Sequence, residues 1–155
     1  MLKVATVEEL AARAGTLLGH SDWLTIDQRM VDAFAGLTGD THWIHVDTDR
    51  AAREMPGGRT IAHGLLLLGL IPDMQKQVYQ VRQRGIGLNY GYDRIRFVSQ
   101  VPVGSRVRLA LTLESIEPHA QGTRVITTAA IEVDGSTKPA LVAQNILLIM
   151  EPKNA

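Results

Sequence analysis

The chain has 155 residues, of which 45% are hydrophobic and 21% are charged, a composition typical of ordinary globular proteins. Sixteen lysines and arginines balance sixteen aspartates and glutamates, so the basic excess that favours nucleic acid or an anionic membrane is missing. There is no cysteine, which excludes disulfides and thiolate metal sites and suits the cytoplasm. We expect one cytoplasmic domain over residues 1–155, with neither nucleic acid nor membrane as a partner.

Residues 6–18 predict the first helix. Apolar side chains recur there at helical spacing, and Thr6 followed by Glu9 forms a capping box. Glu8, Glu9 and Arg13 interrupt the apolar run that an export signal would need, so none is expected.

A brief strand over residues 20–27 is expected to lead into a second helix, because Asp27 is a good helix N-cap. The side chains predicted to face the core from that helix are Met30, Val31, Phe34 and Leu37. Gly39 supplies its stop signal. The stretch from residue 47 to residue 54 then predicts one or two further helical turns.

Residues 60–74, "TIAHGLLLLGLIPDM", predict a central helix that is apolar on every side. Such a helix is typical of burial all round. Pro72 removes a backbone hydrogen bond and predicts a kink, with a more polar continuation to Gln80. The longest nearly apolar run, residues 64–72, is about half of what a bilayer crossing needs.

The second half of the chain predicts β-strands. The segments 85–100, 105–117, 123–134 and 137–150 are rich in Val, Ile, Leu and Thr, and several alternate apolar with polar residues. Short connections with turn residues separate them, so we expect four antiparallel strands joined by hairpins. A buried helix followed by such strands predicts an α+β fold in which one antiparallel sheet wraps around the central helix.

The stretch "GDTHWIH", residues 39–45, places two histidines and an aspartate within six positions. If a turn brings Asp40 and His45 together, the carboxylate and the imidazole can hold one water between them and exchange protons with it. One group that accepts a proton from water and one that donates a proton to the substrate are the minimum needed to add water to an activated double bond. The spacing alone is also compatible with Asp40 as a helix cap and His45 as a hydrogen-bonded core histidine.

A metal site is the other chemical interpretation of this stretch. His42 and His45 are three residues apart and would share a helical face, with Asp40 or His63 as a third ligand. Neither cysteine nor an HExxH pattern supports such a site. We therefore expect no metal, and the addition of water requires no organic cofactor.

Residues 34–52, "FAGLTGDTHWIHVDTDRAA", resemble the signature of the MaoC-like, R-specific enoyl-CoA hydratases. "AHG" at 62–64 and "VPVGSRVR" from residue 101 are also similar to that family. His42 and Trp43 stand where the broad family has Asn-Pro, and "GDTHWIHVD" instead resembles the branch related to nodulation protein N. The resemblance implies a hotdog fold and a homodimer with substrate between its subunits.

The resemblance also implies roles for particular residues. Asp40 and His45 would activate water for syn addition to a trans-2-enoyl-CoA, which gives an (R)-3-hydroxyacyl-CoA. The thioester carbonyl must be polarised, and the backbone N–H of Gly64, at the start of the central helix, is the candidate donor. Gly64 is alternatively a small residue that lets strand and helix pack closely.

His63, Asn89 and Tyr90 are the remaining candidates for substrate binding. The alternatives are a packing contact for His63 and exposure to solvent for Asn89 and Tyr90. Two rival functions remain, an acyl-CoA thioesterase and a non-catalytic acyl-CoA-binding module. The first is disfavoured because residues 60–71 contain no Asp or Glu. A homodimer is also expected from the open edges of a short wrapped sheet.

Overall fold

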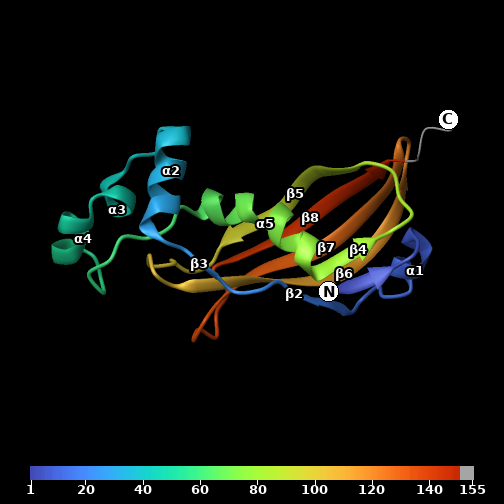
Figure 1. Cartoon of the computed structure of the whole chain (residues 1–155), viewed down its shortest axis with the longest axis horizontal. Coiled ribbons are helices and arrows are strands. Elements are labelled where there is room, and N and C mark those ends of the chain that lie inside the picture. The colour runs from blue at the N-terminus through green and yellow to red at the C-terminus, as the bar shows by residue number, and fades with distance from the viewer. Residues whose placement is uncertain (151–155) are drawn as a thin grey trace.

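A long helix, α5 (Gly64–Val78), lies across one face of an antiparallel sheet (Figure 1). The computed structural model describes residues 1–150. The sheet has the strand order β2-β6-β7-β8-β5, with β3 also paired to β6. Its strands are β2 (Leu17–His20), β3 (Leu24–Thr25), β5 (Gly87–Phe97), β6 (Arg106–His119), β7 (Gly122–Val133) and β8 (Leu141–Met150). The predicted α+β arrangement of one sheet and one central helix is confirmed.

The N-terminal segment differs from the prediction of one helix over residues 6–18. Helix α1 covers only Val7–Ala11, although Thr6 caps it as expected by accepting from the Glu9 N–H. Gly15 then adopts a left-handed φ of 79° and donates its N–H to Leu113 O at 2.8 Å. The chain therefore forms strand β2 here and not a helix, because pairing with the edge of β6 stabilises the strand more than the local helical pattern stabilises a helix.

Two further strands form a small separate sheet. β1 (Leu2–Val4) pairs in parallel with β4 (Tyr79–Val81), which follows α5 directly. The predicted polar continuation of the central helix is therefore confirmed through Gln75 and Lys76 but not as far as Gln80, since α5 ends at Val78. Pro72 lies inside α5.

Three helices gather at the N-terminal end of α5 (Figure 1). They are α2 (Gln28–Thr38), α3 (Trp43–Val46) and α4 (Thr48–Glu54). Asp27 caps α2 and Gly39 ends it in the left-handed conformation, both as predicted. Val31 and Ala35 face the core, but Leu37 is 85% exposed, contrary to prediction. At 100° per residue Leu37 points well away from the face that Val31 and Ala35 share.

The order of the strands corrects the expectation of four strands joined by three consecutive hairpins. β6–β7 and β7–β8 are hairpin neighbours, as predicted, but β5 pairs with β8 at the edge of the sheet and not with β6. The connection after β5 runs instead beside the segment that precedes α5: Ala62 donates to Val101 O, and Val103 donates to Thr60 O, each at 2.8 Å. This connection anchors the start of the central helix.

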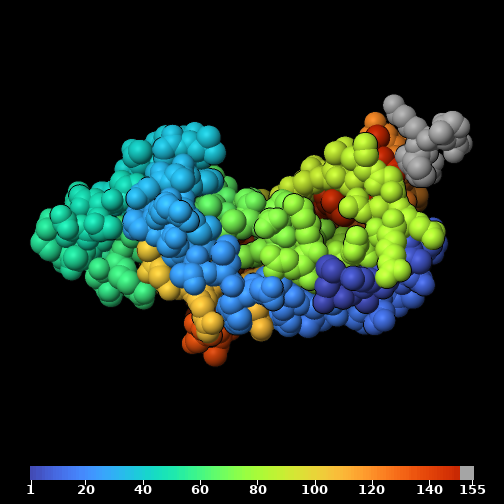
Figure 2. All heavy atoms as spheres, viewed as in Figure 1, coloured from blue at the N-terminus to red at the C-terminus, as the bar shows by residue number. Residues whose placement is uncertain are grey.

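Helix α5 is not buried all round, contrary to prediction. Leu65 is 59% exposed, and Leu68, Gly69 and Pro72 on the same outer side are not buried. Figure 2 shows this side of the helix uncovered. No helix among residues 1–150 has both the length and the apolar character needed to cross a membrane.

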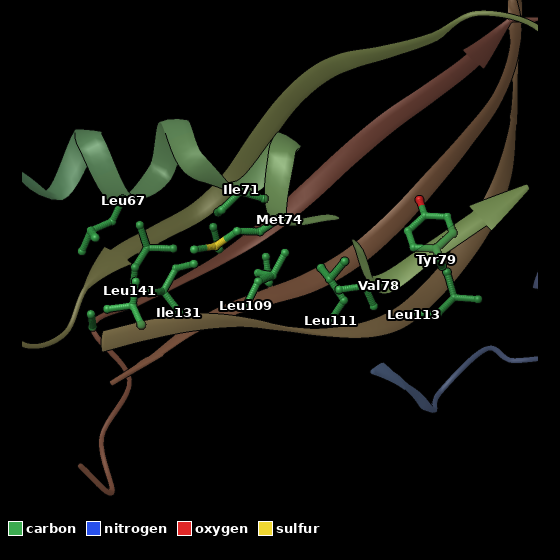
Figure 3. Packing of buried hydrophobic residues seen from close by; sticks show 14 of the residues in the cluster. Leu67, Ile71, Met74, Val78, Tyr79, Leu109, Leu111, Leu113, Ile131 and Leu141 are labelled. Atoms are coloured by element: carbon green, nitrogen blue, oxygen red, sulfur yellow. The ribbon is translucent and has the colours of Figure 1, made fainter. Parts of the chain in front are cut away.

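The inner face of α5 forms the core with the sheet (Figure 3). The helix contributes Leu67, Ile71, Met74 and Val78. Alternate residues of the strands meet them, namely Leu109, Leu111, Leu113, Ile131 and Leu141. This packing fixes α5 on the sheet and so fixes the position of its N-terminus.

Candidate active site

Asp40 directly follows the end of helix α2 and lies close to the N-terminal end of α5. Gly39 has φ of 80° and donates its N–H to Ala35 O at 2.8 Å, which closes the helix. The chain reverses there because glycine tolerates the left-handed conformation without strain. The Asp40 side chain, which follows at once, is 57% exposed.

A single helical turn, α3, carries His45. Its N-cap is His42, whose Nδ1 accepts from the Ile44 N–H at 3.5 Å. Gln28, in the first turn of α2, donates from Nε2 to His45 O at 2.7 Å and accepts from the Thr60 hydroxyl through Oε1. One side chain thus joins α2, α3 and the segment before α5. His45 is only 9% exposed as a result of this packing.

The segment before α5 holds the His45 ring in one orientation. Ile61 donates its N–H to Ile44 O at 3.0 Å, and Ile61 O lies 2.7 Å from His45 Nδ1. A carbonyl oxygen only accepts hydrogen bonds, so Nδ1 must carry the proton. In the neutral imidazole, Nε2 is then the nitrogen with the free lone pair, ready to accept a proton.

His63 lies against His45 and beneath Asp40. It is 3% exposed, and its ring stacks on that of His45 with the centroids 3.7 Å apart. Its Nε2 donates to Asp40 O at 2.9 Å and lies 4.0 Å from Asp40 Oδ2. Of the two roles considered for His63, the structure provides the packing contact. Its contact with substrate stays a prediction.

Burial is the main influence on the charge of His45. It lowers the pKa of His45 from its ordinary value of 6.5, and the neighbouring His63 acts in the same direction. The hydrogen bond to Ile61 O and the Asp40 carboxylate oppose the shift without reversing it. His45 is therefore neutral at neutral pH, and the nitrogen with the free lone pair can act as a base.

Asp40, His45 and His63 each offer one polar atom, and these three atoms lie within 4.8 Å of one another. A water needs about 2.8 Å to each hydrogen-bond partner, so groups at this separation can share one water molecule. The same spacing is compatible with a metal ion, but His42, on which the metal interpretation relied, is outside this cluster. His63 Nε2 is also already occupied as a donor to Asp40 O, which favours proton transfer over metal binding.

Gly64 opens α5 beside this cluster, and His63 is the N-cap. The N–H groups of a first helical turn have no partner within the helix, and they attract negative charge. A Cβ at Gly64 would lie 2.5 Å from the Phe97 ring, so the glycine does permit close packing of helix and strand. Its role as donor to a thioester carbonyl stays a prediction.

Asn89 and Tyr90 lie away from the Asp40 cluster within one chain. Asn89 lies near the C-terminal half of α5, where it lines a cavity with Gln75. Tyr90 is 53% exposed, and its ring centroid is 5.5 Å from that of His119. Their contact with substrate therefore stays a prediction, and it requires a long acyl chain or a second subunit.

Two residues that shape the site had no signal in the sequence. Gln28 is a polar residue in the first turn of a helix, a position that usually faces solvent. Phe97 is the last residue of strand β5, and nothing in the sequence distinguishes it from a core residue. Only the packing of α2 against Thr60, and of β5 against Gly64, gives these residues their positions at the site.

Comparison with known proteins shows which family this chain resembles. Residues 9–134 match the model of the MaoC like domain. The 3-hydroxyacyl-thioester dehydratase Z of Mycobacterium tuberculosis is 48% identical over 143 residues, which cover 92% of this chain and 94% of that protein. Nodulation protein N of Rhizobium leguminosarum bv. viciae is 40% identical over 151 residues, which cover 96% and 94%.

Solved structures support the fold independently. An R-hydratase from Pseudomonas aeruginosa matches with a TM-score of 0.71 at 21% identity, over 92% of this chain and 87% of the other. This similarity confirms the predicted hotdog fold. With the matches in sequence, it shows that the chain belongs to the family of MaoC-like domains.

Proposed function

We propose that this protein is a hydro-lyase that adds water to trans-2-enoyl-CoA thioesters to give (R)-3-hydroxyacyl-CoA, and catalyses the reverse dehydration. The convergence of polar atoms from Asp40, His45 and His63 within 4.8 Å, beside the N-terminus of α5, carries the proposal. The relative named 3-hydroxyacyl-thioester dehydratase supports the class of substrate and reaction.

The proposed reaction begins with a water held between Asp40 and His45. His45 Nε2 takes a proton from this water, because Nδ1 is already engaged as a donor to Ile61 O. The water oxygen then bonds to the β-carbon of the enoyl group. Negative charge moves to the thioester oxygen, where the N–H of Gly64 stabilises it.

Protonation of the α-carbon completes the addition. The proton taken by His45 passes to the α-carbon by way of Asp40, so both residues regain their starting states after each turnover. His63 acts as a positioning residue, since its Nε2 holds the backbone of Asp40 and its ring supports that of His45. No metal or organic cofactor takes part in these steps.

Incubation with crotonyl-CoA tests this proposal against its two rivals. We expect loss of the enoyl absorbance without release of free thiol, and a product of R configuration in chiral analysis. Release of free thiol would instead identify a thioesterase. Binding of the thioester without any turnover would identify a binding module, and an S product would contradict the proposed stereochemistry.

We further propose that two copies associate through strand β5, which forms one edge of the sheet. Unpaired edge strands tend to pair with another chain, and exposed apolar patches mark interfaces. The large apolar side chains exposed on or beside this strand are Ile86, Leu88, Tyr90, Phe97 and Val98. Such a dimer would cover this patch and the neighbouring outer side of α5.

Substitution of Leu88, which is 46% exposed on β5, tests this interface. We expect Leu88→Arg to weaken the homodimer about tenfold or more, because an arginine without a partner would be buried between the subunits. Sedimentation over a range of concentrations measures the change. Leu17→Arg is the matched control, since Leu17 is 53% exposed on β2. A wild-type protein that stays monomeric at micromolar concentration would contradict the proposal.

A further inference from the structure

A cavity of about 180 Å³ lies between the C-terminal half of α5 and strands β5 and β8. Its walls combine apolar groups with three carboxamides, and they include Pro72, Gln75, Tyr79, Asn89, Asn145 and Leu147. Figure 2 shows β8, in red, at the floor of a hollow beside α5. This volume holds about six waters, or a short stretch of a ligand.

Two of these carboxamides are unusual in their burial. Gln75 is 8% exposed and Asn145 is 3% exposed, so both polar side chains are buried between helix and sheet. Burial of an amide is costly unless its hydrogen bonds are satisfied. These side chains therefore need partners in or around the cavity.

The protein satisfies these carboxamides only in part. Gln75 Nε2 donates to the Tyr79 hydroxyl at 2.9 Å. Its Oε1 accepts no side-chain hydrogen bond from residues 1–150 and is not one of the polar atoms sealed from solvent, so it remains available to a group in the cavity. Asn145 makes long contacts, at 3.4 Å to Asn89 Oδ1 and at 3.5 Å to the Thr127 hydroxyl, and its side chain also interacts with the Tyr92 hydroxyl. Weak partners leave hydrogen-bonding capacity for a group that enters the cavity.

The buried polar groups of the cavity, Gln75, Tyr79 and Asn145, are neutral. Burial raises the pKa of Tyr79 to about 12, so its hydroxyl keeps its proton at physiological pH. The lining also includes two exposed cationic residues, Lys76 and Arg84, and the positive charge of Arg84 partly opposes the rise in the pKa of Tyr79. A neutral group that both donates and accepts hydrogen bonds, such as a hydroxyl, matches this interior whichever way each amide is oriented.

The cavity and the Asp40 cluster lie along the same helix. Gly64 and Gln75 are eleven positions apart on α5, or about 16 Å along its axis. Within one chain, the apolar outer side of the helix between them consists of the exposed Leu65 and Gly69 and the half-buried Leu68 and Pro72. With carbon–carbon bonds of about 1.5 Å in a zigzag, roughly a dozen carbons span this distance.

We propose that this cavity binds a hydroxyl group on the distal part of the acyl chain, so that the protein selects long enoyl-CoA thioesters that carry one. The inference rests on the proposed hydratase activity, with the thioester carbonyl at Gly64. The acyl chain follows the apolar side of α5, and its hydroxyl meets Gln75, Asn89 and Asn145. This assigns Asn89 to the tail of the substrate and not to the reacting carbons.

Paired substrates test this selection. We compare trans-2-tetradecenoyl-CoA with the same thioester carrying a hydroxyl at about carbon 12, the position that the length of α5 indicates. We expect kcat/KM to be about tenfold higher for the hydroxylated substrate, the effect of one or two added hydrogen bonds. In Gln75→Leu, this ratio should fall to about one.

The ratio within one variant does not depend on how much of the protein is folded. Gln80→Leu is the matched control, because Gln80 is exposed on β4 outside the cavity, and it should keep the wild-type ratio. A wild-type ratio near one, or an unchanged ratio in Gln75→Leu, would overturn the inference. Crotonyl-CoA is too short to reach the cavity, so its hydration by the wild-type protein tests the proposed function separately.

Discussion

Replacement of Asp40 by Asn should lower kcat/KM for crotonyl-CoA about a hundredfold or more, the usual effect of losing a positioned acid or base. The amide has nearly the same shape as the carboxylate, but it cannot carry the proton from His45 to the α-carbon. The Asp40 side chain is 57% exposed, so the substitution should leave the fold intact. Steady-state rates and circular dichroism on the same sample measure the two effects.

Asp49→Asn provides a matched control, because Asp49 is an exposed carboxylate in the first turn of α4. Its rate should stay close to that of the wild-type protein. If Asp40→Asn instead hydrates crotonyl-CoA at the wild-type rate, the proposed proton path through Asp40 is wrong. A protein that only binds acyl-CoA would show no turnover in any of the three forms.

Local signals in the sequence predicted the elements whose ends depend on nearby residues. Helix α2 begins after Asp27 and ends before Gly39, as expected, because a helix cap depends only on residues within one turn of the helix end. The hairpins β6–β7 and β7–β8 also follow from their short turns. These features need no knowledge of the rest of the fold.

Elements that depend on distant partners were predicted less well. Leu17 and Leu18 fit a helical pattern, but the free edge of β6 pairs with them as strand β2. Strand β5 pairs with β8, which lies about fifty residues further along the chain, and no turn residue encodes that choice. The sequence likewise does not indicate that one side of α5 is exposed. An apolar helix has the same residue pattern whether that side faces solvent or a second subunit.

The candidate site likewise combines features that local sequence predicts with contacts that depend on distant partners. The motif around Asp40 and His45 indicated two side chains that converge, and the structure brings them together with His63. The sequence gives no sign that His63 stacks on His45, or that Gln28 joins three segments behind the site. These contacts depend on how α2 and α3 pack at the end of α5, which only the folded chain determines.

His45→Gln should also lower kcat/KM for crotonyl-CoA about a hundredfold or more, because glutamine cannot accept the proton of the water. In the wild-type protein, the rate should be constant above about pH 6.5 and fall at lower pH as His45 becomes protonated. The midpoint of this fall should lie below 6.5, since burial lowers the pKa of His45. A profile of kcat/KM against pH measures it.

The same lowered pKa has a consequence for stability. His45 binds a proton more readily in the unfolded chain than in the folded protein, so acid favours unfolding. The unfolded chain has a His45 pKa of about 6.5, and above this pH neutral His45 makes its full contribution to the free energy of unfolding. That contribution is lost as the pH falls through the lower His45 pKa of the folded protein. Urea unfolding at about pH 5 and about pH 7.5 should therefore show a smaller loss of stability in His45→Gln than in the wild-type protein. Equal losses in both proteins would mean that His45 is not the buried group that acid must charge, and the base would have to be sought at Asp40.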